Sequence, residues 1–134
     1  MTNRVLVPMD DSEPARSALT HALERFPDDE VTVVHAVDDL ETGYGGGSSA
    51  SDGTDSEPAF FDDVRALAGE YDRSVETIVV GGTAAEAILE YAHDADVDQI
   101  VMGSKGRSGV SRMLLGSVAE AVARRSSVPV TIVP

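Results

Sequence analysis

Short apolar runs recur along the chain, and each is bounded by polar or turn-forming residues. Valine and isoleucine dominate these runs, which is typical of strands buried on both faces of a parallel sheet. The last run contains Pro129, which cannot donate to a ladder and therefore belongs at a sheet edge or a strand start. Five strands are predicted, over residues 4–10, 31–37, 74–80, 99–103 and 128–133.

Between these runs, apolar residues recur at steps of three and four, which is the spacing of amphipathic helices. Ser12 is a candidate N-cap, and Thr83 with Glu86 and Ser117 with Glu120 form candidate capping boxes. Helices are predicted from Ser12 to about residue 26, over 59–72, over 84–96 and over 118–125. Strands and helices therefore alternate, and the pattern predicts an α/β fold in which a doubly wound, five-stranded parallel sheet carries helices on both faces.

Segment 38–58 departs from this pattern, because it is rich in glycine, serine and acids and nearly devoid of apolar side chains. Such a composition buries too little surface to offset the entropy of ordering the chain. We interpret it as a flexible surface loop inside one domain of residues 1–134, since 134 residues are enough for one core. A lid over a binding site is the alternative.

Composition narrows the class of protein. The chain has 24 acidic and 10 basic residues, a net charge of −14 and no cysteine. So acidic a chain is a poor partner for nucleic acid and resembles the solvated surfaces of halophilic proteins. The absence of cysteine excludes disulfides, thiolate metal sites and cysteine nucleophiles. No apolar run reaches the length of a membrane span and no leader is evident, so we expect a cytoplasmic protein without a membrane partner.

Segment 99–117 concentrates the candidate chemistry. Gly103 and Gly106 follow a predicted strand, and Gly116 and Ser117 open a predicted helix whose N–H groups and dipole favour an anion. No acid occurs from residue 99 to 119, whereas three cations do, namely Lys105, Arg107 and Arg112. The segment is therefore a candidate site for a polyanion such as the phosphates of a nucleotide. The alternative is a solvated loop that is merely basic.

Asp10 is the second candidate, because it follows the first strand. Ligands of open α/β sheets bind outside the carboxyl ends of the strands, where a carboxylate can accept hydrogen bonds from a ribose. The alternative is an ordinary turn aspartate. His35 lies inside the second strand, and we interpret it as a packed, hydrogen-bonded core residue, because nothing near it supplies metal-ligand spacing.

The spacing G-x2-G-x9-G-S, with Gly103, Gly106, Gly116 and Ser117 in its fixed positions, closely resembles the ATP-binding signature of the universal stress protein family. The P-x-D ending of the first strand matches the contact that this family makes with ribose and adenine. The stretches VLVPMDDSE and GSVAEAVARRSSVPVTIV extend the resemblance over nearly the whole chain outside the 38–58 loop.

The resemblance implies a Rossmann-like domain of the adenine nucleotide alpha hydrolase type that binds ATP or AMP with Mg²⁺ held by the phosphates. The acidic composition adds the expectation of a halophilic archaeal source. The resemblance also implies a homodimer through residues 128–133 and a nucleotide-dependent regulatory role in the stress response. Two alternatives stay open: a weak ATPase, although no residue is evident that would activate water, and a dimerising adaptor without a nucleotide. No catalytic residue and no metal ligand are predicted. The implied contacts are Pro8, Met9, Asp10, Ala36, Met102, Gly103, Lys105, Gly106, Arg107, Gly116, Ser117 and Val118.

Overall fold

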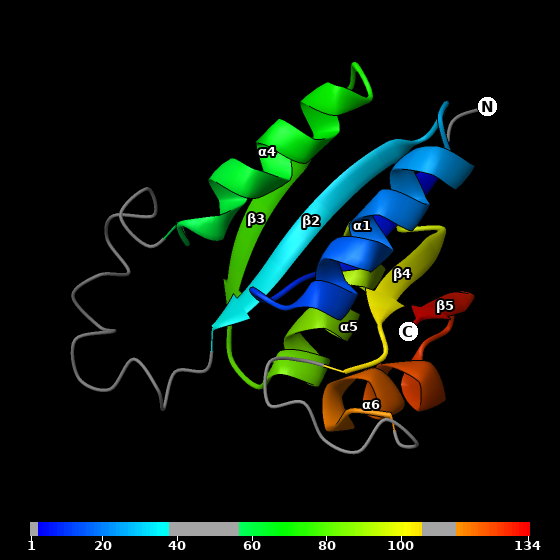
Figure 1. Cartoon of the computed structure of the whole chain (residues 1–134). Helices are drawn as coiled ribbons and strands as arrows, with labels where there is room; N and C mark the ends of the chain where they lie inside the picture. Colours follow the sequence, from blue (N-terminus) through cyan, green and yellow to red (C-terminus); the bar gives the residue numbers. More distant parts are fainter. Residues whose placement is uncertain (1–2, 38–56, 106–114) are drawn as a thin grey trace.

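The computed structural model describes residues 3–37, 57–105 and 115–134, which form one five-stranded sheet flanked by four helices (Figure 1). The strands lie in the order β3-β2-β1-β4-β5, and every neighbouring pair is parallel. This arrangement confirms the predicted doubly wound α/β fold. The strands are β1 (Arg4–Pro8), β2 (Glu30–Val37), β3 (Glu76–Gly81), β4 (Gln99–Gly103) and β5 (Val130–Val133).

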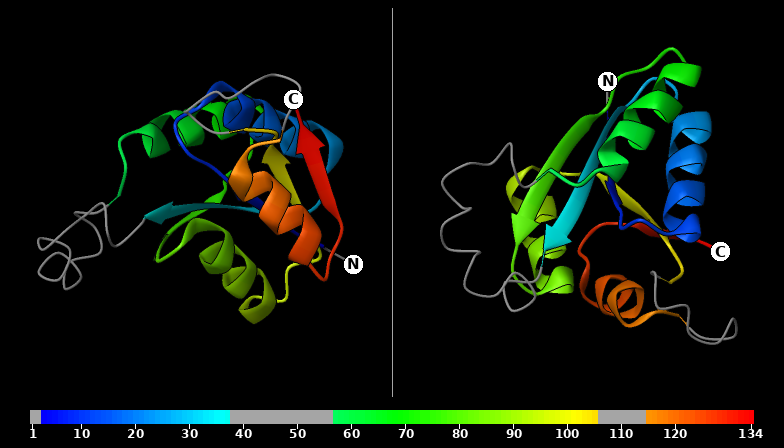
Figure 2. Two further views of the ribbon diagram at one scale, coloured as in Figure 1. Left: turned by 90° about the horizontal axis from the view of Figure 1, so that it is seen from below. Right: turned by 60° about the vertical axis from the view of Figure 1, so that its left-hand side comes forward.

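Helices cover both faces of the sheet, as Figure 2 shows. Alternate residues of β1 face opposite ways: Val5 and Val7 pack with α1 and α4, and Leu6 packs with α5 and α6. Both faces of β1 are therefore buried, which explains its unbroken apolar sequence. The helices are α1 (Glu13–Arg25), α4 (Phe60–Glu70), α5 (Ala84–Asp94) and α6 (Ser117–Arg125).

The helix starts agree only in part with the predicted caps. Ser12 caps α1 as expected, since its hydroxyl accepts a hydrogen bond from the Ala15 N–H at 3.3 Å. Thr83 occupies the N-cap of α5, but its side chain makes no capping hydrogen bond within the described chain. The predicted capping box at Ser117 is wrong, because Gly116 is the N-cap and Ser117 is already the first helical residue. This shift moves Glu120 to the fourth helical position, one place beyond that of a capping box.

Several strand ends also differ from the prediction by two residues. β1 ends at Pro8, so Asp10 lies in the loop that follows, and β3 begins at Glu76 instead of residue 74. β5 begins at Val130 because the Ser126 hydroxyl bonds both the N–H and the carbonyl of Val128, which forms a turn there. Pro129 precedes this edge strand, as its missing N–H predicts.

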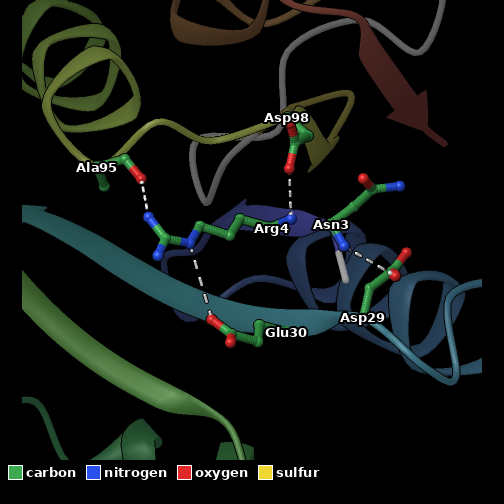
Figure 3. A network of polar contacts seen from close by, with 6 residues as sticks. All are labelled: Asn3, Arg4, Asp29, Glu30, Ala95 and Asp98. Atoms are coloured by element: carbon green, nitrogen blue, oxygen red, sulfur yellow. Dashed lines mark hydrogen bonds and ion pairs between the residues drawn. The ribbon is translucent and has the colours of Figure 1, made fainter. Parts of the chain in front are cut away.

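A polar network ties the amino ends of β1, β2 and β4 together (Figure 3). The Arg4 N–H donates to Asp98 Oδ2 and its guanidinium to the Ala95 carbonyl, both at 2.7 Å, and the Asn3 N–H donates to Asp29 Oδ1 at 3.1 Å. Arg4 also forms an exposed ion pair with Glu30 at 3.9 Å. These contacts fix one end of the sheet and leave the carboxyl ends of the strands for a ligand.

The helices of the described chain are short, since the longest, α1, has 13 residues. None of those that the structure describes combines the length and the apolar character that crossing a membrane requires.

Candidate functional site

A cavity of about 550 Å³ opens at the carboxyl ends of β1, β2 and β4, between the starts of α5 and α6. The strand order reverses between β1 and β4, so the chain leaves these two strands toward opposite faces of the sheet. Open α/β sheets hold ligands at such a point. The cavity thus lies where the topology alone would place a binding site.

Ten of the twelve predicted site residues line this one cavity, although they come from three distant stretches of sequence. The other two, Gly106 and Arg107, lie outside the described residues, as do Arg112 and most of the 38–58 loop. The ten are Pro8, Met9, Asp10, Ala36, Met102, Gly103, Lys105, Gly116, Ser117 and Val118.

The first wall of the cavity is the loop from β1 to α1, which contains Met9 and Asp10. Met9 is 5% exposed, and both of its backbone polar groups bond to β2. Its N–H donates to the Val34 carbonyl at 2.8 Å, and its carbonyl lies 2.9 Å from Nδ1 of His35. The loop that carries Asp10 is therefore fixed by the neighbouring strand.

The second wall joins the end of β4 to the start of α6. The Ser104 N–H donates to the Val133 carbonyl at 2.8 Å, and the Gly116 N–H donates to the Ser104 carbonyl at 2.7 Å. A Cβ on Gly116 would lie 3.0 Å from the Cα of Lys105, so a glycine lets these two stretches approach closely. Lys105 is consequently held next to the first turn of α6.

The electrostatics of this wall suit an anion. The first turn of a helix has N–H groups without intrahelical acceptors and carries the positive end of the helix dipole. In α6 this turn begins at Ser117, and it lines the cavity together with Lys105. Asp10 and Glu120 also line the cavity, and Glu120 forms an exposed ion pair with Arg124 at 3.6 Å.

The histidine and acidic side chains of the described chain are the candidate metal ligands. Across residues 3–37, 57–105 and 115–134, the structure contains no group of three histidine or acidic side chains arranged to hold a metal ion.

Eight lining residues were not predicted from the sequence. They lie in the second half of β2, in the first two turns of α1, α5 and α6 or, for Leu115, just before α6, and most carry apolar side chains. Some of them, such as His35, Leu115 and Ala119, directly adjoin predicted contacts, which is the one signal in the sequence that could have identified them. The structure confirms His35 as packed and hydrogen-bonded, but places it half-buried on the cavity instead of in the core. The eight are Ala15, Val34, His35, Ala84, Ile88, Leu115, Ala119 and Glu120.

Comparison with known proteins agrees with this architecture. The family model of the universal stress protein family matches residues 1–134. Universal stress protein MJ0577 of Methanocaldococcus jannaschii is 29% identical over 154 aligned positions, covering 99% of this chain and 95% of that protein. The solved structure of MJ0577 superposes with a TM-score of 0.82 at 31% identity and covers 99% of this chain and 96% of its own.

Two further solved structures are complexes with nucleotides. One is a universal stress protein in complex with cAMP, 24% identical with a TM-score of 0.69 and covering 98% of this chain and 97% of its own. The other, from Archaeoglobus fulgidus in complex with dAMP, is 22% identical with a TM-score of 0.69 and covers 100% and 98%. At these identities they show a shared fold only. With a family model that matches its whole length, this chain belongs to the universal stress protein family.

Proposed function

We propose that the cavity binds an adenine nucleotide and that the protein acts as a nucleotide-dependent regulator in the stress response. One observation carries the proposal: residues predicted from three distant stretches of sequence line a single cavity. Its volume of about 550 Å³ falls within the roughly 300–1,000 Å³ usual for small-ligand pockets. The complexes with cAMP and dAMP concern proteins less than 25% identical to this chain, so the proposal depends on the residues of this chain.

The two walls of the cavity favour different parts of the nucleotide. Phosphates belong beside Lys105 and the first turn of α6, because these supply the cation and the exposed N–H groups. The nucleoside belongs beside Asp10 and Ala36, where a carboxylate can accept from the ribose and the backbone of β2 can meet the base.

ATP or AMP is the proposed ligand. Mg²⁺ is proposed to accompany it, held through the phosphates, because Mg²⁺ binds nucleotides mainly through phosphate oxygens and water.

Mass spectrometry of the ligand released from gently purified protein tests this proposal directly. Calorimetry in molar KCl then compares AMP, ATP and inorganic tripolyphosphate. Asp10→Asn should weaken AMP and ATP by roughly tenfold or more, the effect of a hydrogen bond to a charged group, and should leave tripolyphosphate unchanged. Lys105→Ala should weaken ATP and tripolyphosphate most. Asp28→Asn, at the opposite end of β2, is the control and should change none of them.

Measurements with ATP also distinguish nucleotide binding from the two alternative functions, the adaptor and the weak ATPase. Wild-type protein that neither retains nor binds a nucleotide at millimolar concentration would favour the adaptor that needs no nucleotide. Release of ADP from ATP, abolished by a cavity variant, would favour the weak ATPase.

We also propose that the protein forms a homodimer through residues 128–133 and works in the cytoplasm. β5 is an edge strand that pairs only with β4 among the described strands, and uncovered edges invite pairing. Thr131→Lys places a charge on this strand outside the two apolar clusters and should yield monomers in light scattering. A monomeric wild-type protein at micromolar concentrations would refute the dimer.

A further inference from the structure

His35 joins the two parts of the nucleoside wall. Its Nδ1 lies 2.9 Å from the Met9 carbonyl, and a carbonyl oxygen can only accept. Nδ1 must therefore carry the hydrogen and donate. The neighbouring residue Val34 accepts from the Met9 N–H at 2.8 Å. Two consecutive residues of β2 thus hold both backbone polar groups of Met9.

The imidazole is itself fixed by packing. Its ring lies edge-on to Phe60 at a centroid distance of 5.2 Å and an interplanar angle of 85°. Phe61 lies 6.5 Å from the same ring at 81°, and the two phenylalanines contact each other at 5.2 Å. Both are buried at the start of α4, so α4 sets the direction in which His35 donates.

The Met9 carbonyl belongs to the planar peptide unit that ends at the Cα of Asp10. Fixing that oxygen orients the whole unit and so places Asp10, the proposed ribose contact. Ala36, the proposed adenine contact, directly follows His35 in β2. His35 therefore links the loop that contains the proposed ribose contact to the strand that contains the proposed base contact.

We propose, on the basis of the proposed nucleotide site, that His35 is a positioning residue for the nucleoside end of the ligand. His35 also lines the cavity, but the role proposed for it is to orient Met9 and, through Met9, the Asp10 contact. A histidine that merely filled space would affect the stability of the fold, and any loss of binding would then fall equally on both walls. A positioning residue affects the nucleoside wall and leaves the phosphate wall intact.

A matched pair of variants tests this role. His35→Phe keeps an aromatic ring against Phe60 but removes the donor, whereas His35→Asn keeps an N–H near the place of Nδ1 but removes the ring. Calorimetry with AMP and with inorganic tripolyphosphate, in molar KCl, measures each wall separately. His35→Phe should bind AMP roughly tenfold more weakly, because a displaced Asp10 carboxylate would lose its hydrogen bond with the ribose. His35→Asn should bind AMP within a few-fold of wild type, and both should bind tripolyphosphate normally.

Three outcomes overturn the proposal. They are unchanged AMP affinity in His35→Phe, an equal loss of AMP and tripolyphosphate, and a loss in His35→Asn as large as that in His35→Phe. Nitrogen-15 NMR of the wild-type imidazole needs no variant and should show the Nδ1–H tautomer, so an Nε2–H tautomer also overturns it. Wild-type protein that binds no AMP refutes the proposed function itself, a result distinct from all of these.

Discussion

Gly103 ends β4 at the point where the strand passes directly against the start of α1. A Cβ there would lie 2.7 Å from the carbonyl carbon of Pro14 and 2.8 Å from its oxygen, and backbone atoms cannot yield as a flexible side chain does. Gly103→Ala should therefore push β4 and α1 apart, lower the free energy of unfolding by roughly 1–3 kcal/mol and weaken AMP binding.

Urea denaturation measures this change, and Gly69→Ala in α4 is the matched control. A Cβ on Gly69 meets no described atom within 4 Å, and alanine favours a helix over glycine by roughly 0.5–1 kcal/mol. Gly69→Ala should thus be neutral or stabilising. Equal effects of the two substitutions would show that the contact with Pro14 costs nothing.

Gly103 also shows how much the sequence could predict about a single residue. Its place at the end of a predicted strand and the resemblance of its spacing to a family signature marked Gly103 as a residue at a binding site, and it does line the cavity. Its close approach to Pro14 depends on how α1 packs on β4, which is a tertiary contact that no local pattern reports. His35 is similar, because its donor function depends on a carbonyl 26 residues away.

At the scale of elements, two serines at helix starts should behave differently. The Ser12 hydroxyl caps α1 and is 7% exposed, whereas Ser117 lies inside the first turn of α6 and makes no capping bond with any described residue. Ser12→Ala should lower the free energy of unfolding by about 1 kcal/mol, the usual value of an N-cap, and Ser117→Ala should leave it nearly unchanged. Thermal and urea melts compare the two. An equal loss of unfolding free energy in the two variants would support the predicted capping box at Ser117.

Apolar periodicity predicted the existence and the type of each described helix and strand, but not all of their ends. The start of β5 depends on the turn that Ser126 makes with Val128, and α4 stops near Asp72, whose backbone has a φ of 56°. These are local hydrogen-bond and backbone choices that carry little hydrophobic signal. Ala85 is buried on α5 at 7% exposure, which periodicity cannot predict because alanine suits either face of a helix.

At the scale of the whole molecule, alternating strands and helices predicted the parallel sheet, and the sheet predicted where a ligand lies. The order β3-β2-β1-β4-β5 brings Asp10 and Lys105 to one cavity although 95 positions separate them. The sequence could not predict the apolar lining between these polar ends, since in the sequence Ile88 and Leu115 resemble any other apolar residue.

The net charge of −14 is also a property of the whole molecule, and it leads to a prediction about salt. The ion pairs of the described chain are exposed and therefore weak, so they offset little of the repulsion among the acids. The screening length grows from roughly 3 Å at 1 M to 30 Å at 0.01 M salt, so repulsion in the compact state increases as salt is removed. The melting temperature should fall as KCl decreases from molar to low-millimolar, at constant protein concentration.

Neutralising exposed acids separates this repulsion from a specific effect of potassium. Asp28, Glu90 and Asp94 are exposed and lie at or near helix ends, and Asp94 is also at the unfavourable negative end of α5. Replacing all three with Asn or Gln should raise the melting temperature at low salt and narrow its difference from the value at 1 M. Sodium chloride should act as potassium chloride does, because screening depends on ionic strength. A wild-type melting temperature that does not change with salt concentration over this range would contradict the halophilic interpretation, and the acidic surface would then need another explanation.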